Sequence, residues 1–220
     1  MLDAPKRDRI AERREATQRE ILEAAWTLAR ERGLLEFTLR DVADRVGMRA
    51  PSLYTHFPSK HAIYDAMFGQ AWSDYERLIL AETLPADPRA AVRRASRVFF
   101  DFSVADPARS QLMIQRTIPG FEPSPESYAP AVRTMEHSRR LMSELGVTDP
   151  DDYDIWISLL SGLVNQQLAN EPGGARWSAL LDRAVDFWAD GVGLPPSPQG
   201  RRTTDKPAPR RRSRATRSTG

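Results

Sequence analysis

Residues 37–60 read FTLRDVADRVGMRAPSLYTHFPSK, and this stretch decides the fold of the first third of the chain. A helix is predicted to begin at Thr38, because Thr followed three residues later by Asp41 resembles a capping box, with Asp in place of the usual Glu. Gly47 ends this helix, since a residue without Cβ can adopt the positive φ of a tight turn. A short helix follows, with Pro51 in its first turn, where a missing N–H is tolerated. The pattern therefore predicts two short helices joined by a glycine turn.

A preceding helix, from Thr17 to Arg32, completes this unit. Its apolar residues recur at helical spacing and can form a three-helix core with those of the two short helices: Ile21, Leu22, Leu28, Val42, Val46, Leu53 and Phe57. The opposite face of the last short helix carries small and polar residues: Ala50, Pro51, Ser52, Tyr54, Thr55 and His56. Such a face can enter the major groove of duplex DNA without repelling phosphates, which indicates a DNA-binding helix-turn-helix.

The same stretch resembles a known family. Residues 52–60 read SLYTHFPSK, and an aliphatic helix start, AIY, follows at residues 62–64. Together with Thr38-Leu39, Val42-Ala43 and Val46-Gly47, this pattern resembles the TetR (tetracycline repressor) family of bacterial regulators. The resemblance covers residues 17–68, and beyond them the chain is similar to the family only in the number and order of its helices.

The resemblance implies base contacts for Arg40 and for part of the last short helix: Ala50, Pro51, Ser52 and Thr55. It implies phosphate contacts for Tyr54, His56 and Lys60, and Lys60 also lies beside a helix N-terminus, which favours an anion. Ala50 and Pro51 form few hydrogen bonds, so base contacts are expected to depend on Arg40, Arg49 and Ser52. The candidate DNA-contact residues are Thr38, Arg40, Arg49, Ala50, Pro51, Ser52, Tyr54, Thr55, His56 and Lys60.

Alternatives stay open for several of these residues. Tyr54 can instead cover the three-helix core, and Arg49 can simply be solvated. A basic arm over residues 1–16 can reach an adjacent groove through Lys6, Arg7, Arg9, Arg13 and Arg14. Its acids dilute that charge: Asp3, Asp8, Glu12 and Glu15. His56 and His61 stand in no carboxylate–histidine ligand pattern, so neither a metal site nor a cofactor is expected.

Charge is distributed unevenly along the 220 residues. Residues 1–60 carry 12 Lys/Arg and 10 Asp/Glu, residues 61–198 carry 12 and 19, and residues 199–220 carry 8 and 1, so the local net charges are +2, −7 and +7. Basic ends around an acidic body favour a polyanionic partner. The chain has no Cys, no secretory signal and no apolar run long enough to cross a membrane, so a cytoplasmic location is expected.

The rest of the chain also has helical periodicity, which predicts an all-α fold of about nine helices. One helix is expected from Ser59 to Glu82, and three begin at Asp-Pro pairs: Asp87-Pro88, Asp106-Pro107 and Asp149-Pro150. A Pro-rich loop is expected over 119–130, then helices over 131–145, 151–170 and 175–192. The predicted domains are a flexible arm at 1–16, the helix-turn-helix at 17–68, a sensing and dimerisation domain at 69–194 and a disordered basic tail at 195–220.

The last two helices are apolar on more than one face, so they must be covered on more than one side. Ile155 and Leu159 lie beside Trp156 and Leu160 on the first, while the second combines two stripes: Leu180, Ala184 and Phe187 with Leu181, Val185 and Trp188. The family resemblance implies a homodimer formed by these helices, and the alternative is that both are internal. It also implies a ligand cavity, for which the candidates are Phe99, Phe102, Met113, Arg116, Met135, Trp156 and Asn165, although aromatic and Met residues at helical spacing are more often core.

The predicted function is a homodimeric, sequence-specific transcriptional repressor that a small-molecule ligand releases from a palindromic operator. An architectural DNA binder without sequence preference, driven by the basic tail, is the alternative. An enzyme is not expected, because the chain has no G-x-S-x-G, H-E-x-x-H or G-x-x-x-x-G-K-[ST] pattern and its three His residues are scattered.

Overall fold

A computed structural model describes residues 4–197, which form nine α-helices and no strand. The helices are α1 (Ala4–Arg32), α2 (Leu39–Arg45), α3 (Ala50–Tyr54), α4 (Lys60–Leu80), α5 (Pro88–Ala105), α6 (Pro107–Ile114), α7 (Pro125–Glu144), α8 (Pro150–Asn170) and α9 (Leu181–Gly191). A 3₁₀ turn, η1 (Ser178–Leu180), leads into α9. No helix within these residues is both long and apolar enough to cross a membrane. The all-α prediction is confirmed.

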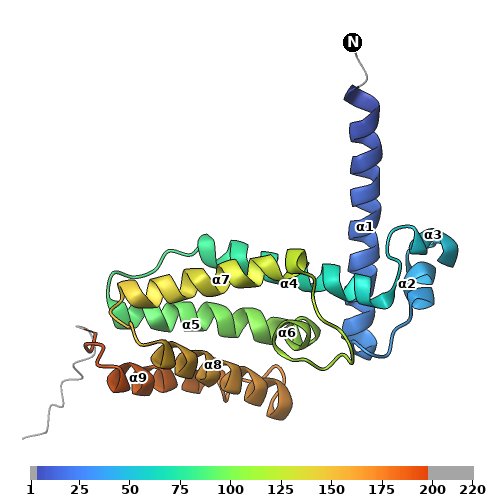
Figure 1. The fold of residues 1–220 in the computed structure, drawn as a ribbon. Helices are drawn as coiled ribbons and strands as arrows, with labels where there is room; N and C mark the ends of the chain where they lie inside the picture. Colours follow the sequence, from blue (N-terminus) through green and yellow to red (C-terminus); the bar gives the residue numbers. More distant parts are fainter. Residues whose placement is uncertain (1–3, 198–220) are drawn as a thin grey trace, which may run out of the picture.

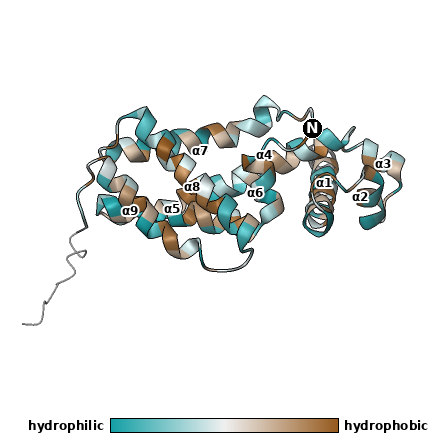
Figure 2. Cartoon of the chain, turned by 90° about the horizontal axis from the view of Figure 1, so that it is seen from below, coloured by the Kyte–Doolittle hydropathy of each residue, from teal (hydrophilic) through white to brown (hydrophobic). Residues whose placement is uncertain are grey.

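The helices α4–α9 form an elongated bundle, and α1 stands across one end of it (Figure 1). Helices α2 and α3 lie beyond α1, at the far end of the molecule from α9. Helix α7 runs along α4 on one side of the bundle, while α8 and α9 pack against α5 on the other. In Figure 2, hydrophobic segments gather where α5 and α8 meet, inside the bundle.

Most helices begin where the sequence predicts. Thr38 forms the expected capping box with Asp41, and Gly47 adopts a φ of 68° in the turn after α2. Four further predicted caps are present: Ser59, Asp87, Asp106 and Asp149. The side-chain oxygens of the first three accept the backbone N–H three residues later, and that of Asp149 accepts the N–H two residues later. Each of these caps satisfies an N–H that a helix start otherwise leaves unpaired.

Three boundaries differ from the sequence prediction. Helix α1 begins at Ala4 rather than Thr17, because Ala, Arg and Glu propagate a helix without an apolar stripe. Helix α7 begins at Pro125 and contains Pro130, because Ser124 caps it and Pro125 suits its first turn. Of the loop predicted over 119–130, only residues 119–124 are therefore non-helical. Residues 175–180 precede α9, since Gln167 Oε1 accepts the backbone N–H groups of Trp177 and Ser178 there.

Two clusters of buried side chains organise the molecule. The first runs from α1–α3 through α4 into α6 and α7, and the second joins α5, α8 and α9. Helix α4 contributes Ile63 and Met67 near α1–α3, and Trp72 and Tyr75 farther along the bundle. The first cluster is therefore continuous across residue 68, where the sequence places a domain boundary. The predicted basic tail falls outside the described residues from 198 onward.

Candidate nucleic-acid interface and bundle cavities

The register of α3 is set by two buried residues. Leu53 is fully buried and Phe57 nearly so, as the three-helix core requires. The opposite side of α3 is exposed, and it carries Pro51, Ser52, Tyr54 and Thr55, while Ala50 and His56 are half-buried. Tyr54 is 51% exposed, so its ring does not serve mainly to cover the core. The structure thus brings the predicted recognition residues to one outward face.

Some of the candidate DNA-contact residues already form hydrogen bonds within the chain. Thr55 Oγ1 donates to the carbonyl of Ser52 at 2.7 Å, so its hydroxyl is held against its own helix. Thr38 Oγ1 is bonded to the carboxylate of Asp41 at 2.6 Å and serves the capping box of α2. Among the described residues, His56 Nδ1 is buried without a hydrogen-bond partner. Thr38 therefore has a structural role in addition to the DNA contact predicted for it.

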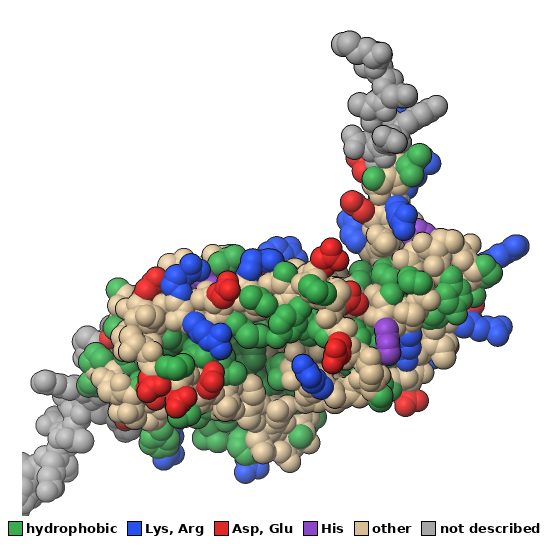
Figure 3. Space-filling model, in the orientation of Figure 1, with side chains coloured by type: hydrophobic (Ala, Val, Ile, Leu, Met, Phe, Trp, Pro, Cys, Tyr) green, Lys and Arg blue, Asp and Glu red, His purple; other side chains and the backbone are tan. Residues whose placement is uncertain are grey.

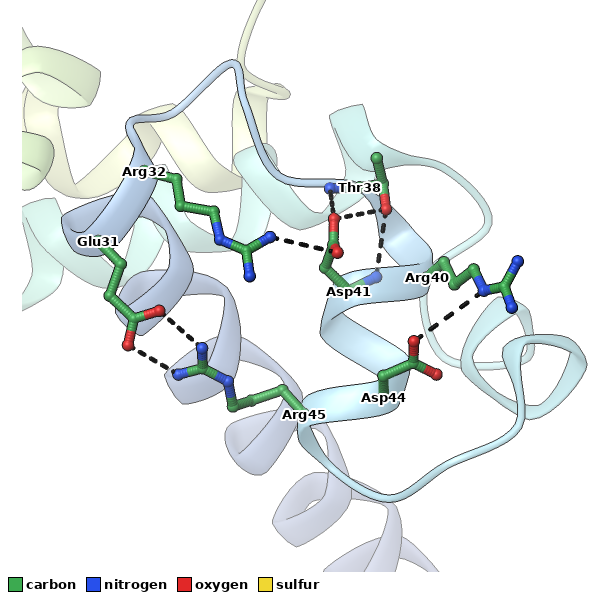
Figure 4. Close-up of polar contacts among 7 residues, drawn as sticks. All are labelled: Glu31, Arg32, Thr38, Arg40, Asp41, Asp44 and Arg45. Atoms are coloured by element: carbon green, nitrogen blue, oxygen red, sulfur yellow. Dashed lines mark hydrogen bonds and ion pairs between the residues drawn. The ribbon is translucent and has the colours of Figure 1, made fainter.

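Two ion pairs hold α2 against the C-terminal end of α1 (Figure 4). Arg45 forms a two-pronged pair with Glu31, at 2.6 and 3.0 Å, and Arg32 reaches Asp41 at 3.3 Å. The hydrogen bond from Arg45 lowers the pKa of Glu31, and hydrogen bonds from Thr38 lower the pKa of Asp41. These contacts fix the position of α2, and through it the position of α3.

Arg40 is held much less firmly than the other charges of α2. Its side chain is 86% exposed, and its contact with Asp44 is long, at 4.0 Å (Figure 4). An exposed pair of this kind contributes little to stability, so the guanidinium can reorient toward a partner. Arg49, just before α3, is also exposed. Figure 3 shows basic side chains projecting from this end of the molecule.

Lys60 is placed differently from the sequence expectation. Its Nζ donates to the carbonyl of Leu35 at 2.8 Å and lies 4.6 Å from the ring centre of Phe37 and 5.4 Å from that of Tyr64. Partial burial lowers the pKa of this amine. Lys60 therefore ties α4 to the connection between α1 and α2, and a phosphate contact requires that bond to be shared or broken.

Residues 21–67, which contain this arrangement, match the family model described as "Bacterial regulatory proteins, tetR family". The N-terminal domain is a TetR-family domain. Among proteins of known role, the chain is 32% identical over 95 residues to the HTH-type transcriptional regulator EthR of Mycolicibacterium smegmatis, covering 41% of this chain and 43% of EthR. It is 25% identical over 181 residues to the class A tetracycline repressor protein of Escherichia coli, covering 76% and 78%.

Solved structures extend the likeness to the whole fold. A tetR-family transcriptional regulator from Streptomyces coelicolor superposes with a TM-score of 0.64 at 21% identity, over 80% of each chain. The fold outside the TetR-family domain is therefore shared, although few residues are identical. The match to EthR spans less than half of that protein's length.

Two cavities of the bundle are lined in part by α4 and α7; α5 and α8 complete the first, and α6 with the segment after it completes the second. One is a small cavity of about 40 Å³, mostly apolar, with polar groups at His137, Ser138 and Glu82. Its other lining residues include Tyr75, Ile79, Val98, Leu141 and Trp156. The other, of about 210 Å³, lies near the start of α7 and the end of α6, and its lining includes Phe68, Met113, Arg116, Ile118, Phe121 and Tyr128. A molecule in either cavity contacts both α4 and α7.

The seven predicted ligand residues do not meet in one cavity. Trp156 lines the first cavity, and Met113 and Arg116 line the second. Asn165 lies in a shallow hollow beside α6, where its Oδ1 accepts from Gln115 Nε2 at 2.9 Å. The remaining three pack against the first core cluster: Phe99, Phe102 and Met135.

Of the residues that line the first cavity, only Trp156 was predicted from the sequence; those that were not include Tyr75, Ile79, His137 and Leu141. Ile79 follows Tyr75 by four residues on α4, and Leu141 follows His137 by four residues on α7. This spacing marks one face on each helix, but it does not show that the two faces meet. The pairing of α4 with α7 is what brings them to the same cavity.

Helices α8 and α9 form a stripe of exposed apolar and small residues. Their inner sides are buried, through residues such as Leu160 and Val185. Their outer sides leave Ile155 55% exposed, Leu180 39% exposed and Phe187 63% exposed, with small residues between them at Ser158, Gly162, Ala169 and Gly191. These residues belong to the second apolar face predicted from the sequence, and the guanidinium of Arg183 lies over the ring of Phe187, 5.1 Å from its centre.

Proposed function

We propose that this chain is a sequence-specific DNA-binding transcriptional regulator. The observation that carries the proposal is the outward face of α3 in a TetR-family domain. Leu53 and Phe57 hold that face away from the core, and Ser52 and Tyr54 present polar groups on it. A short helix with small and polar side chains fits the major groove, where base edges differ in their donors and acceptors.

The contacts separate into two kinds. Arg40 and Ser52, which are exposed and weakly engaged, are proposed to contact bases. Tyr54 and His56 are neutral donors, and they are proposed to hold phosphates and set the register of α3 in the groove. Lys60 supports this end of the domain through Leu35 and joins the phosphate contacts only when DNA competes for its amine.

The exposed stripe on α8 and α9 supports a homodimer. Phe187 and Ile155 are large apolar side chains in water, and the small residues around them allow close approach of another helix. A second copy of the chain is the proposed occupant, because a two-fold axis through this stripe would hold two α3 helices on one side of a duplex. Such a dimer matches a palindromic operator with half-sites about one helical turn, roughly 34 Å, apart or a multiple of that distance.

A small-molecule effector is proposed to act through α4. Asp65 on α4 accepts three hydrogen bonds from the start of α7. The donors are the N–H and hydroxyl of Ser124, which caps α7, and the hydroxyl of Ser127. Farther along, Arg133 of α7 pairs with Glu76 of α4 at 2.6 Å. At Gly69 the helices are so close that a Cβ would lie 3.2 Å from Ser127. Since Lys60 opens α4, a ligand that moves α7 also moves the DNA-binding end.

The coupling has a required consequence. An effector that lowers operator affinity must itself bind the operator complex more weakly, by the same factor. We would screen compounds by the shift in unfolding temperature, then titrate each one that binds into free protein and into protein saturated with operator. Equal affinities in the two titrations would contradict the proposed effector mechanism and leave the DNA-binding proposal intact.

DNase footprinting on the DNA upstream of the protein's own coding sequence, with excess random duplex as competitor, tests the main proposal. A specific regulator protects a discrete two-fold symmetric site in the presence of the competitor. Protection that disappears in proportion to the competitor would instead indicate a binder without sequence preference. Turnover of a substrate by the purified protein would show instead that the chain is an enzyme.

A further inference from the structure

The N-terminal half of α1 projects from the body of the molecule as a single helix, beyond α2 and α3 (Figure 1). Both acidic and basic side chains are visible on this projecting part (Figure 3). In the linear sequence the acids dilute the bases. In a helix, however, each side chain has a fixed direction around the axis, so charges that alternate in sequence can lie on different sides.

The two sides of α1 are identified by its contacts near the other end. Glu31 and Arg32 pair with Arg45 and Asp41, so they mark the side that faces α2. Arg30 pairs with Asp106 at 2.7 Å, so it marks the side that faces α6 and the bundle. Trp26 donates to Gln70 of α4 at 2.9 Å and also faces the bundle.

Five helical turns contain about 18 residues, so residues 18 apart point in the same direction. Arg13 and Arg14 therefore point as Glu31 and Arg32 do, toward the side on which α2 and α3 lie. Glu12 points as Arg30 does, toward the bundle side. Arg9 lies one turn before Arg13, and Glu15 lies near the direction of Glu12. Over residues 9–15 the helix thus places its charges on a basic edge (Arg9, Arg13 and Arg14) and an acidic edge (Glu12 and Glu15). Farther along, Glu20 points nearly as Arg13 does and Arg19 nearly as Glu12 does, so the separation is confined to the projecting part.

All five of these side chains are exposed, and none of the ion pairs found among the described side chains involves them. Ile10, four residues before Arg14, is 69% exposed on the basic edge. We infer that this edge is a second DNA-contact surface, which grips the phosphate backbone flanking the bases that α3 contacts. The acidic edge keeps the helix from binding DNA by its opposite side. This inference rests on the proposed function, because it takes the α3 face as the side where DNA lies.

Two matched double variants test the surface. Arg13→Gln with Arg14→Gln removes two charges from the basic edge, and Glu12→Gln with Glu15→Gln removes two from the acidic edge. The first is expected to weaken operator and random duplex alike, on the order of tenfold at ~0.1 M salt. It should also reduce the slope of log affinity against log salt by about one for each phosphate that is no longer neutralised. The second is expected to change affinity less than about twofold, because those residues face away from the duplex.

Equal and opposite changes from the two variants would overturn the inference, since they would show that only net charge matters. An exchange variant, Glu12→Arg with Arg13→Glu, keeps composition and net charge and is expected to bind as weakly as the first. Circular dichroism of each variant establishes that α1 is still helical. If the wild-type chain bound no duplex at all, the proposed function would fail. If it bound and Arg13→Gln with Arg14→Gln left affinity and salt dependence unchanged, this inference alone would fail.

Discussion

The outward face of α3 and the outward stripe of α8 and α9 are both exposed, but their chemistry is opposite. On α3 the exposed side chains are polar, including Ser52 and Tyr54, with Arg40 and Arg49 close by in the sequence. On α8 and α9 they are Ile155, Phe187 and small residues. The first surface suits a hydrated, charged partner such as duplex DNA, and the second suits an apolar partner that excludes water. The difference is the basis of the proposal that the chain binds two partners at once, through opposite parts of the molecule.

The largest effect is expected from charging the apolar stripe. Phe187→Glu should convert a dimer into a monomer, because burying an unpaired carboxylate costs several kcal/mol. Operator affinity should then fall by about a hundredfold or more, since each chain keeps only one recognition helix. Sedimentation velocity measures the first effect and filter binding the second. Leu80→Glu, which charges an apolar residue that is 60% exposed outside the stripe, is the matched control and should remain dimeric.

Arg40→Ala tests the polar surface. Loss of a base contact should reduce the discrimination between operator and single-base variants by roughly 1–3 kcal/mol at the position that Arg40 contacts. The fold should be unaffected, because the pair of Arg40 with Asp44 is exposed and long. Competition binding against a panel of single-base variants gives the profile. A uniform loss across the whole panel would show that Arg40 holds the backbone instead.

Lys60→Ala is expected to have two smaller effects that separate by measurement. Loss of the hydrogen bond to Leu35 and of the contact with the Phe37 ring should lower the free energy of unfolding by about 1–2 kcal/mol. Binding should weaken equally for operator and random DNA. Urea unfolding reports the first effect. A shift in base preference would mean that α3 is docked differently from the arrangement proposed.

The smallest effect is expected from acidification. The hydrogen bond from Arg45 lowers the pKa of Glu31, and the hydrogen bonds from Thr38 lower the pKa of Asp41. These contacts therefore stabilise the fold above the unfolded values of 4.5 and 3.8 and lose that effect as the pH falls through the lower folded values. The unfolding temperature should be recorded from about pH 6 to about pH 3, a range that brackets these groups. It should fall less steeply with decreasing pH in Arg45→Gln than in the wild type. Parallel curves would show that the pair of Arg45 with Glu31 contributes nothing measurable.

The two surfaces and the cavities differ in how far the sequence predicts them. The α3 face follows from local register, because Leu53 and Phe57 fix which neighbours point outward. The caps at Thr38, Ser59 and the Asp-Pro pairs are local as well. The residues that line the first cavity were not predicted as a group, because a cavity depends on how side chains from four helices meet. Tyr75 and His137 face one cavity only because α4 and α7 pair, and no motif in the sequence encodes that pairing.

The helix α1 shows a different limit. Its charged N-terminal half has no apolar periodicity, so the sequence favoured a flexible arm, whereas helix-forming residues extend α1 to Ala4. Once the segment is helical, the acidic and basic side chains of residues 9–15 lie on different sides of α1. Lys60 shows a third limit, since its motif implies a phosphate contact while the fold directs its amine to Leu35.

The central claim is that two chains, joined by α8 and α9, place two α3 helices on one operator. The most direct measurement is the stoichiometry and footprint of the complex on the same duplex, by sedimentation equilibrium and hydroxyl-radical protection. We predict two chains per duplex, protected half-sites about 34 Å apart or a multiple of that distance, and loss of both features in Phe187→Glu. A single chain bound with full affinity to one half-site would contradict the claim.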